Sequence, residues 1–269
     1  SNNKRGDRQS HIDDHLASIC GCESSLVVNN NAAALFLSIN TLAPGSEVIC
    51  SRGQIVEIGG SFRISDIIKK SDAILKEVGT TNRTHIEDYE KEISDRTKLL
   101  LWVHTSNYVV KGYTKEVALE EIAKLGKKYN IPVLADLGSG TFLPLGKYGI
   151  PTEIPIKDII KKGPDIVLFS GDKMLGGPQS GIILASKNII ELIKSNTLYR
   201  TMRCDKITIA LLDQIIRSYR KHGFTNLNLA LSLLSNTREK LKNIAINIIN
   251  FLPDKKIKTL GLSFEASLV

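Results

Sequence analysis

A lysine in a glycine-rich turn is the strongest chemical signal in the sequence. Lys173 lies in the stretch Ser170–Gly181, between an apolar run that ends at Phe169 and a second apolar run, 182–185. Such a turn after a strand lets a ligand approach the backbone closely. A lysine there can hold a phosphate as a point charge, or form a Schiff base with a carbonyl cofactor once desolvation favours a neutral amine. The alternative is an ordinary solvated lysine.

An aspartate and an asparagine-rich helix start accompany this lysine. Asp136 ends the apolar run 131–135, and the asparagines 29–31 link the apolar run 26–28 to an apolar helix that they can cap. The free N–H groups and the dipole of a helix start attract anions such as phosphate. Lysine, aspartate and a phosphate site at neighbouring strand ends would suit pyridoxal phosphate. The alternatives are a simple strand-end cap for Asp136 and a structural salt bridge for the pair.

Seven strands are expected to position these groups. They are predicted at 26–30, 47–51, 73–78, 98–103, 131–135, 165–169 and 181–185. Helical patterns are predicted at 7–20, 32–43, 65–70, 86–93, 115–129, 206–221 and 229–249. This alternation is typical of an α/β fold with a seven-stranded, mostly parallel sheet flanked by helices. Functional groups gather at the carboxyl ends of such strands. Those ends carry Asn29–Asn31, Arg52, Asn82-Arg83, His104–Asn107, Asp136 and Ser170–Lys173.

Composition sets wider bounds on the function. The chain has 269 residues, of which 42% are hydrophobic and 24% charged, as expected for a soluble globular protein. It contains no apolar run of membrane-spanning length and no export signal at its start, so we expect a cytoplasmic protein. The net charge of +8 is concentrated between Lys194 and Lys258. This surplus indicates either a polyanionic or phosphate-bearing partner or merely a lysine-rich surface.

Other cofactor and metal sites have weaker signals. The first strand is not followed by Gly-x-Gly-x-x-Gly, and the chain lacks the phosphate-binding Gly-x₄-Gly-Lys-Ser/Thr motif, which disfavours dinucleotide and P-loop sites. The four cysteines have no metal-binding spacing, and we expect small buried side chains in a reducing compartment. His11 and His15 have the spacing of metal ligands on a helix, but no third ligand is apparent nearby.

Six segments in chain order resemble those of bacterial selenocysteine synthases, the L-seryl-tRNA(Sec) selenium transferases. They are NNNAAA (29–34), SRGQIVEIGGSFRI (51–64), EVGTTNRTH (77–85), VHTSNY (103–108), DLGSG (136–140) and SGDKMLGGPQSG (170–181). The resemblance runs from about Arg5 to about Tyr219. It implies the large domain of a fold-type-I pyridoxal-phosphate enzyme, in a family that forms ring-shaped homodecamers built from dimers.

The resemblance also implies roles for individual residues. Lys173 would carry the cofactor and act as the catalytic base, with Asp136 under the pyridine nitrogen. Asp172 matches a family aspartate near the active site, without a defined role. Arg200 and Arg203 match arginines that hold the phosphate of selenophosphate. Their spacing of three residues would place both on one face of a helix, where they could bind an oxyanion together. The further cofactor-binding candidates are Asn30, Asn31, Ala32, Ser170, His104 and Asn107.

The implied reaction replaces the serine hydroxyl of seryl-tRNA(Sec) by selenium. It proceeds by β-elimination to an aminoacrylate, to which selenophosphate adds selenium, and it yields selenocysteinyl-tRNA(Sec). The alternatives are a related pyridoxal-phosphate lyase acting on a small amino acid or amino sugar acid, and a non-catalytic tRNA-binding fragment. No membrane partner is expected.

The chain departs from the family pattern at both ends. It is expected to lack the family's small N-terminal tRNA-binding domain and a segment that carries a further active-site arginine. We therefore predict an N-terminally truncated cofactor-binding domain over residues 1–222. Residues 223–269 would form a linking helix and the start of a truncated small C-terminal domain. No aromatic residue occupies an obvious position for stacking on the cofactor ring.

Overall fold

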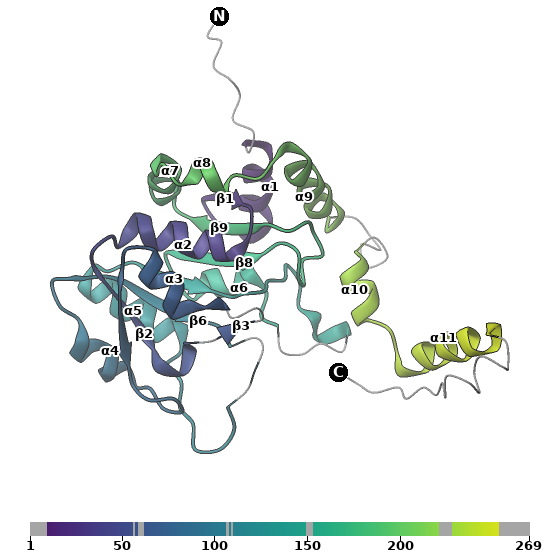
Figure 1. Ribbon diagram of the computed structural model, residues 1–269, viewed down its shortest axis with the longest axis horizontal. Coiled ribbons are helices and arrows are strands. Elements are labelled where there is room, and N and C mark those ends of the chain that lie inside the picture. The colour runs from purple at the N-terminus through teal and green to yellow at the C-terminus, as the bar shows by residue number, and fades with distance from the viewer. Residues whose placement is uncertain are drawn as a thin grey trace, which may run out of the picture.

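A seven-stranded sheet, in the order β1-β9-β8-β7-β6-β2-β5, runs through the centre of the computed structural model (Figure 1). The structure describes residues 10–55, 57–58, 62–105, 108, 110–148, 153–220 and 228–252. The strands of this sheet are β1 (Ser24–Val28), β2 (Glu47–Ser51), β5 (Ile74–Val78), β6 (Thr97–Val103), β7 (Val133–Asp136), β8 (Ile166–Ser170) and β9 (Gly181–Ala185). Only β9 runs antiparallel to its neighbours, β1 and β8. The predicted seven-stranded, mostly parallel sheet is therefore confirmed.

The strands form because their apolar runs are buried on both faces of the sheet. In β8 all five residues are buried, as is typical of a central strand covered on both sides. Val167 and Phe169 face one hydrophobic core, whereas Ile166 and Leu168 face the other. The period of two thus divides one continuous apolar run between two cores.

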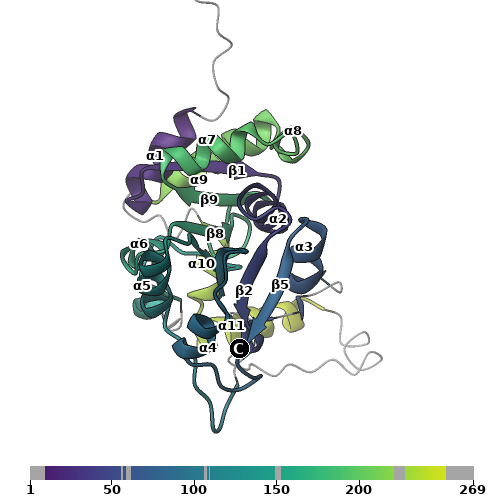
Figure 2. The same ribbon diagram turned by 90° about the vertical axis from the view of Figure 1, so that its left-hand side faces the viewer.

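Helices cover both faces of the sheet (Figure 2). One core packs against α1 (Ser10–Cys20), α4 (Ile86–Glu92), α5 (Leu119–Tyr129), α6 (Ile156–Lys161) and α9 (Lys206–Ser218). The other core packs against α2 (Asn31–Leu42), α3 (Ile64–Lys70) and α7 (Lys187–Ser195). The short helix α8 (Tyr199–Met202) follows α7. Among the described residues, these helices and strands make the α/β architecture that the sequence predicts.

Several local predictions need correction. The expected helix 115–129 begins only at Leu119. The helices α6 and α7 were not predicted, nor were the 3-10 turns Arg52–Gln54 and Leu145–Tyr148. A two-stranded hairpin of β3 (Glu57–Ile58) and β4 (Phe62–Arg63) was also missed. All of these are short elements, for which periodic patterns carry little signal.

The predicted long helix 229–249 is in fact two helices. They are α10 (Leu229–Leu234) and α11 (Arg238–Phe251). A new helix begins after Thr237, because the side chain of Thr237 accepts a hydrogen bond from the amide of Lys240 and caps α11. α11 has no buried residue, and Figure 1 shows it extending away from the sheet.

Two further features complete the fold. His15 on α1 pairs with α9, since its Nδ1 lies 2.6 Å from Oδ1 of Asp213. Cys20, Cys50 and Cys204 are buried and Cys22 is partly buried, all as free thiols. Burial raises the pKa of the Cys22 thiol to about 11, so that it stays protonated. None of the helices described is both long and apolar enough to cross a membrane.

Candidate active site

The chemically active side chains gather at one edge of the sheet. Strands β1, β8, β7, β6, β2 and β5 all point the same way, because β9 is antiparallel to both β1 and β8. Asn29, His104, Asp136 and Ser170 therefore end or follow strands at a common carboxyl edge. Asp136 and Ser170 end the adjacent strands β7 and β8. These four predicted residues therefore lie along one edge of the sheet.

Asp136 is a buried carboxylate held by two donors. Its Oδ1 accepts hydrogen bonds from Asn31 Nδ2 at 2.8 Å and from the amide of Gly138 at 2.9 Å. Burial raises the pKa of Asp136, whereas these two bonds and the charge of Lys173 act in the opposite direction. Such a carboxylate is stabilised by a cation brought next to it, as a protonated pyridine nitrogen would be.

The start of α2 reaches across the sheet to this carboxylate. α2 packs against β1, β9 and β8, which places Asn31 beside Asp136 of β7. The side chain of Asn30 caps the helix by accepting a bond from the amide of Ala33 at 2.8 Å. Asn31 and Ala32 precede this bonded amide, so their N–H groups are those that a helix start offers to an external anion. The side chain of Asn30 thus caps the helix whose first turn carries these free N–H groups.

A glycine allows α2 to start so close to the sheet. A Cβ built on Gly181 would lie 2.1 Å from the carbonyl oxygen of Asn30. Gly181 pairs with Val28 on one side and with Ser170 on the other. Only β9 therefore separates buried Ser170, on β8, from the end of β1. This is the edge where an anion at the helix start would lie.

Two buried polar atoms at this edge test whether a ligand fits. Within the described part of the chain, Asn31 Oδ1 and Ser139 Oγ have no hydrogen-bond partner. A buried polar atom without a partner is costly, and proteins seldom keep one without a ligand or a water. Asn31 begins α2 and bonds to Asp136, and Ser139 lies three residues after Asp136, the last residue of β7. The edge therefore fits a polar ligand such as pyridoxal phosphate.

Lys173 projects from a closed backbone turn after β8. Gly171 donates to Ser180 O at 2.8 Å, Gly177 donates to Gly171 O at 2.8 Å, and Gly176 donates to Lys173 O at 2.9 Å. Asp172 and Lys173 are exposed in this turn. The charge of Lys173 is near enough to oppose the rise in the pKa of Asp136 that burial causes. The two side chains nevertheless make no ion pair within 4.0 Å. A ligand can thus lie between the lysine amine and the carboxylate.

Of the two predicted phosphate-binding arginines, Arg203 lies beside the end of β1. Arg203 forms a β-bridge with Val28, and the amide of Asn29 bonds to Met202 O at 2.9 Å. The expected single helical face for Arg200 and Arg203 is wrong, because α8 ends at Met202 and Arg203 is extended. Both arginine side chains are exposed. The chain therefore brings Arg203 to the carboxyl edge of the sheet through strand pairing instead of a helix.

Of the predicted residues after β6, the structure describes His104 but not Asn107. The amide of His104 donates to Asp136 O at 2.8 Å, so its backbone lies at the site. Its ring stacks on Trp102, with the ring centroids 5.9 Å apart. Asn107 lies outside the described residues.

Sequence reasoning missed three residues that the structure joins to this edge. Ser139 was signalled only by the Gly-Ser-Gly that follows Asp136. Tyr219 and Asn228, which bond to the turn of Lys173, had no local motif.

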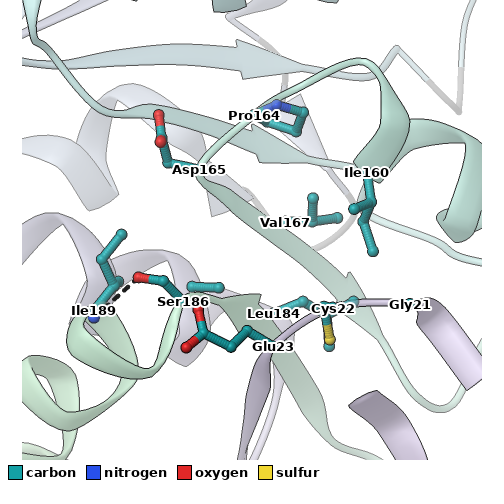
Figure 3. Close-up of a pocket in the computed structure, with 11 residues that line it drawn as sticks. Gly21, Cys22, Glu23, Ile160, Pro164, Asp165, Val167, Leu184, Ser186 and Ile189 are labelled. Atoms are coloured by element: carbon teal, nitrogen blue, oxygen red, sulfur yellow. Dashed lines mark hydrogen bonds between the residues drawn. The ribbon is translucent and has the colours of Figure 1, made fainter. Parts of the chain in front are cut away.

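A cavity of about 330 Å³ lies at the opposite edge of the sheet (Figure 3). It is lined by Cys22 and Glu23 before β1, by Asp165 and Val167 at the start of β8, and by Ser186 after β9. None of the predicted site residues lines it. The cavity is therefore separate from the site at Asp136 and Lys173.

Comparisons with known proteins agree with the sequence motifs. Residues 1–268 match a family model described as L-seryl-tRNA selenium transferase. Relatives named L-seryl-tRNA(Sec) selenium transferase include those of Caldanaerobacter subterraneus subsp. tengcongensis and Clostridium botulinum strain Okra. The first is 53% identical over 217 residues, which are 81% of this chain and 47% of the relative. The second is 47% identical over 260 residues, which are 95% of this chain and 56% of the relative.

The match to these relatives is partial in length. A third relative, from Desulfotalea psychrophila, is 52% identical and is covered over 46% of its length by 80% of this chain. The chain thus spans about half the length of the curated relatives that it matches.

A solved structure shares the fold at much lower identity. The structure of D-glucosaminate-6-phosphate ammonia-lyase aligns with a TM-score of 0.72 and 18% identity. The alignment covers 90% of this chain and 64% of that one. It supports the predicted fold class and carries no information on the substrate.

Proposed function

Because the chain belongs to the L-seryl-tRNA selenium transferase family, we propose that its carboxyl edge binds pyridoxal phosphate and serves the conversion of seryl-tRNA(Sec) to selenocysteinyl-tRNA(Sec) with selenophosphate. The observation that carries the proposal is Asp136, buried at a strand end, with Asn31 and Gly138 holding its Oδ1 and Lys173 on the adjacent turn. The charge of Lys173 acts on Asp136 although the two make no ion pair within 4.0 Å, so a flat cofactor could be placed between carboxylate and amine.

Residues already at the edge supply each part of a cofactor site. Lys173 would bind the aldehyde carbon, and Asp136 would face the protonated pyridine nitrogen. The amides of Asn31 and Ala32, together with Ser170, would take the phosphate. When bound, pyridoxal phosphate supplies an electron sink for the carbanion that forms at the amino acid's α-carbon.

The chain's own residues then perform the proton and anion steps. The free Nζ of Lys173 removes the proton from the α-carbon of the seryl group. Asp136, in its ionised form, would stabilise a positive charge on the ring nitrogen. Arg200 and Arg203 bind the oxyanion of selenophosphate by charge-assisted hydrogen bonds. Arg203 is well placed for this task because it lies next to the start of α2 through its bridge to Val28.

The partners follow from the same proposal. They are seryl-tRNA(Sec), selenophosphate and further copies of the chain, assembled from dimers to a decamer, in the cytoplasm. The identities of 46–53% to selenium transferases favour this activity over a lyase acting on a small amino acid.

A chimera tests the proposal despite the partial length of the chain. The matched 260-residue segment of the Clostridium botulinum relative is replaced by the corresponding segment of this chain. We expect the chimera to convert seryl-tRNA(Sec) when selenophosphate and pyridoxal phosphate are present. Lys173→Ala should abolish conversion, whereas Lys187→Ala, a change of an exposed lysine at the opposite edge, should leave it intact. A folded chimera that binds the cofactor but makes no selenocysteinyl-tRNA would reject the proposed activity.

A further inference from the structure

The turn that carries Lys173 is clamped from one side by two buried side chains. The carbonyl oxygen of Leu175 accepts bonds from Tyr219 Oη at 2.9 Å and from Asn228 Nδ2 at 2.8 Å. Asn228 Nδ2 also donates to Tyr219 Oη at 2.9 Å. One carbonyl, one hydroxyl and one amide thus form a closed set of three hydrogen bonds, which we call the Leu175 clamp.

The clamp is dry and well supported. Asn228 and Leu175 are 0% exposed and Tyr219 is 8% exposed. The Oδ1 of Asn228 accepts from the amide of Leu231 and caps α10. The ring of Tyr219 packs edge-on against Phe142 at 5.1 Å between centroids. A buried network with every member satisfied stabilises one geometry over its alternatives.

The Leu175 clamp contacts the same short turn that contains Lys173. Leu175 lies two residues after Lys173, and the amide of Gly176 closes the turn onto Lys173 O. Gly176 has a φ of +70°, and a Cβ there would lie 2.3 Å from Asn228 Oδ1. The backbone at Gly176 therefore packs directly against Asn228, with no room for a side chain at this position.

We propose that Tyr219 and Asn228 are positioning residues that set the location of the Lys173 amine relative to Asp136. The inference rests on the proposed function of Lys173. Neither side chain needs to touch the cofactor, because each acts through the Leu175 carbonyl. They lie on either side of the predicted domain boundary at residue 222, so one side chain from each predicted domain bonds to the lysine turn.

Tyr219→Phe is the sharpest test, because it removes one hydroxyl and keeps the ring against Phe142. We expect the dissociation constant for pyridoxal phosphate to rise about fivefold, the equivalent of one hydrogen bond. The pH midpoint of the visible absorption band of the lysine–cofactor adduct should shift as well. Asn228→Asp keeps the acceptor that caps α10 but places a carboxylate oxygen against Leu175 O, and it should have the larger effect.

Tyr89→Phe is the matched control. Tyr89 is also buried, and its hydroxyl accepts a bond from the amide of Ser51 at 3.0 Å, away from the lysine turn. It should lower thermal stability at least as much as Tyr219→Phe while leaving cofactor affinity and the pH midpoint unchanged.

The outcomes separate this inference from the proposed function. If the wild type forms no adduct at Lys173, the proposed function fails. If the wild type forms it and Tyr219→Phe matches the wild type in affinity and pH midpoint, the positioning role fails. Equal shifts in Tyr219→Phe and Tyr89→Phe would also overturn it, because they would reflect general loss of stability. Should Asn228→Asp not fold, Tyr219→Phe decides by itself.

Discussion

Asn31 Nδ2 donates a 2.8 Å hydrogen bond to Oδ1 of Asp136, a residue 105 positions further along the chain. The bond ties the first turn of α2 to the end of β7. It joins the group that would face the ring nitrogen of the cofactor to the helix start that would hold its phosphate. Its removal should therefore disturb both ends of the proposed site.

Asn31→Ala should weaken binding of pyridoxal phosphate by about tenfold. Hydrogen bonds to charged groups contribute about 1.5–3 kcal/mol, and part of this is recovered by rearrangement. Asn30→Ala is the matched control, since it removes the cap on Ala33 and should cost about 1 kcal/mol of unfolding free energy. Titration of the visible band and denaturant unfolding separate the two effects. Equal cofactor affinity in Asn31→Ala and wild type would contradict the assigned role.

Asp136→Asn should stabilise the cofactor-free protein at neutral pH. Burial raises the pKa of the folded carboxyl, so its charge costs nothing below the unfolded pKa and lowers stability as pH rises through the folded pKa. The gain in free energy of unfolding from Asp136→Asn should shrink as pH falls toward the ordinary pKa of aspartate. Urea unfolding at several pH values measures it.

Asp205→Asn should instead lower the stability of the protein at neutral pH. A bond from the amide of Thr208 is the main reason why the pKa of Asp205 is lowered, so its ionised form stabilises the fold. A neutral-pH loss of stability in Asp136→Asn, equal to that of Asp205→Asn, would show that Asp136 is a structural cap.

Gly181→Ala should destabilise the fold by about 1–3 kcal/mol, the usual cost of overpacking. The new methyl group would meet the Asn30 carbonyl oxygen at 2.1 Å and push α2 away from the sheet. Gly146→Ala is a suitable control, because its Cβ would have no neighbour within 4 Å. Thermal unfolding of both variants tests this. A neutral Gly181→Ala would mean that α2 can withdraw from the sheet without loss.

His15→Gln should make the protein more sensitive to acid. Burial of Asp213 opposes its ionisation, but hydrogen bonds from His15 and Arg217 outweigh this and lower its pKa. A lowered carboxyl pKa stabilises the fold above the unfolded pKa, and this contribution is lost as pH falls through the folded pKa. The variant should lose part of this contribution, and its acid unfolding midpoint should rise. An unchanged midpoint would show that the α1–α9 pair adds no pH-dependent stability.

The sequence predicts the sheet edge well and the contacts across it poorly. Apolar runs ending at Asp136 and Phe169 locate two adjacent strand ends, because parallel strands bring their carboxyl ends together. The bond between Asn31 and Asp136 depends instead on how α2 crosses the face of the sheet, which no local pattern encodes. The Leu175 clamp likewise joins residues 44 and 53 positions apart. Its two side chains resemble ordinary helix-end residues in the sequence.

The central claim is that Lys173 is the lysine that binds pyridoxal phosphate. The chain is incubated with the cofactor, reduced with borohydride and digested, and the modified lysine is identified by mass spectrometry. We expect the pyridoxyl group on Lys173 and a lower yield of it in Asp136→Ala. Labelling spread over exposed lysines, unchanged in Lys173→Ala, would contradict it.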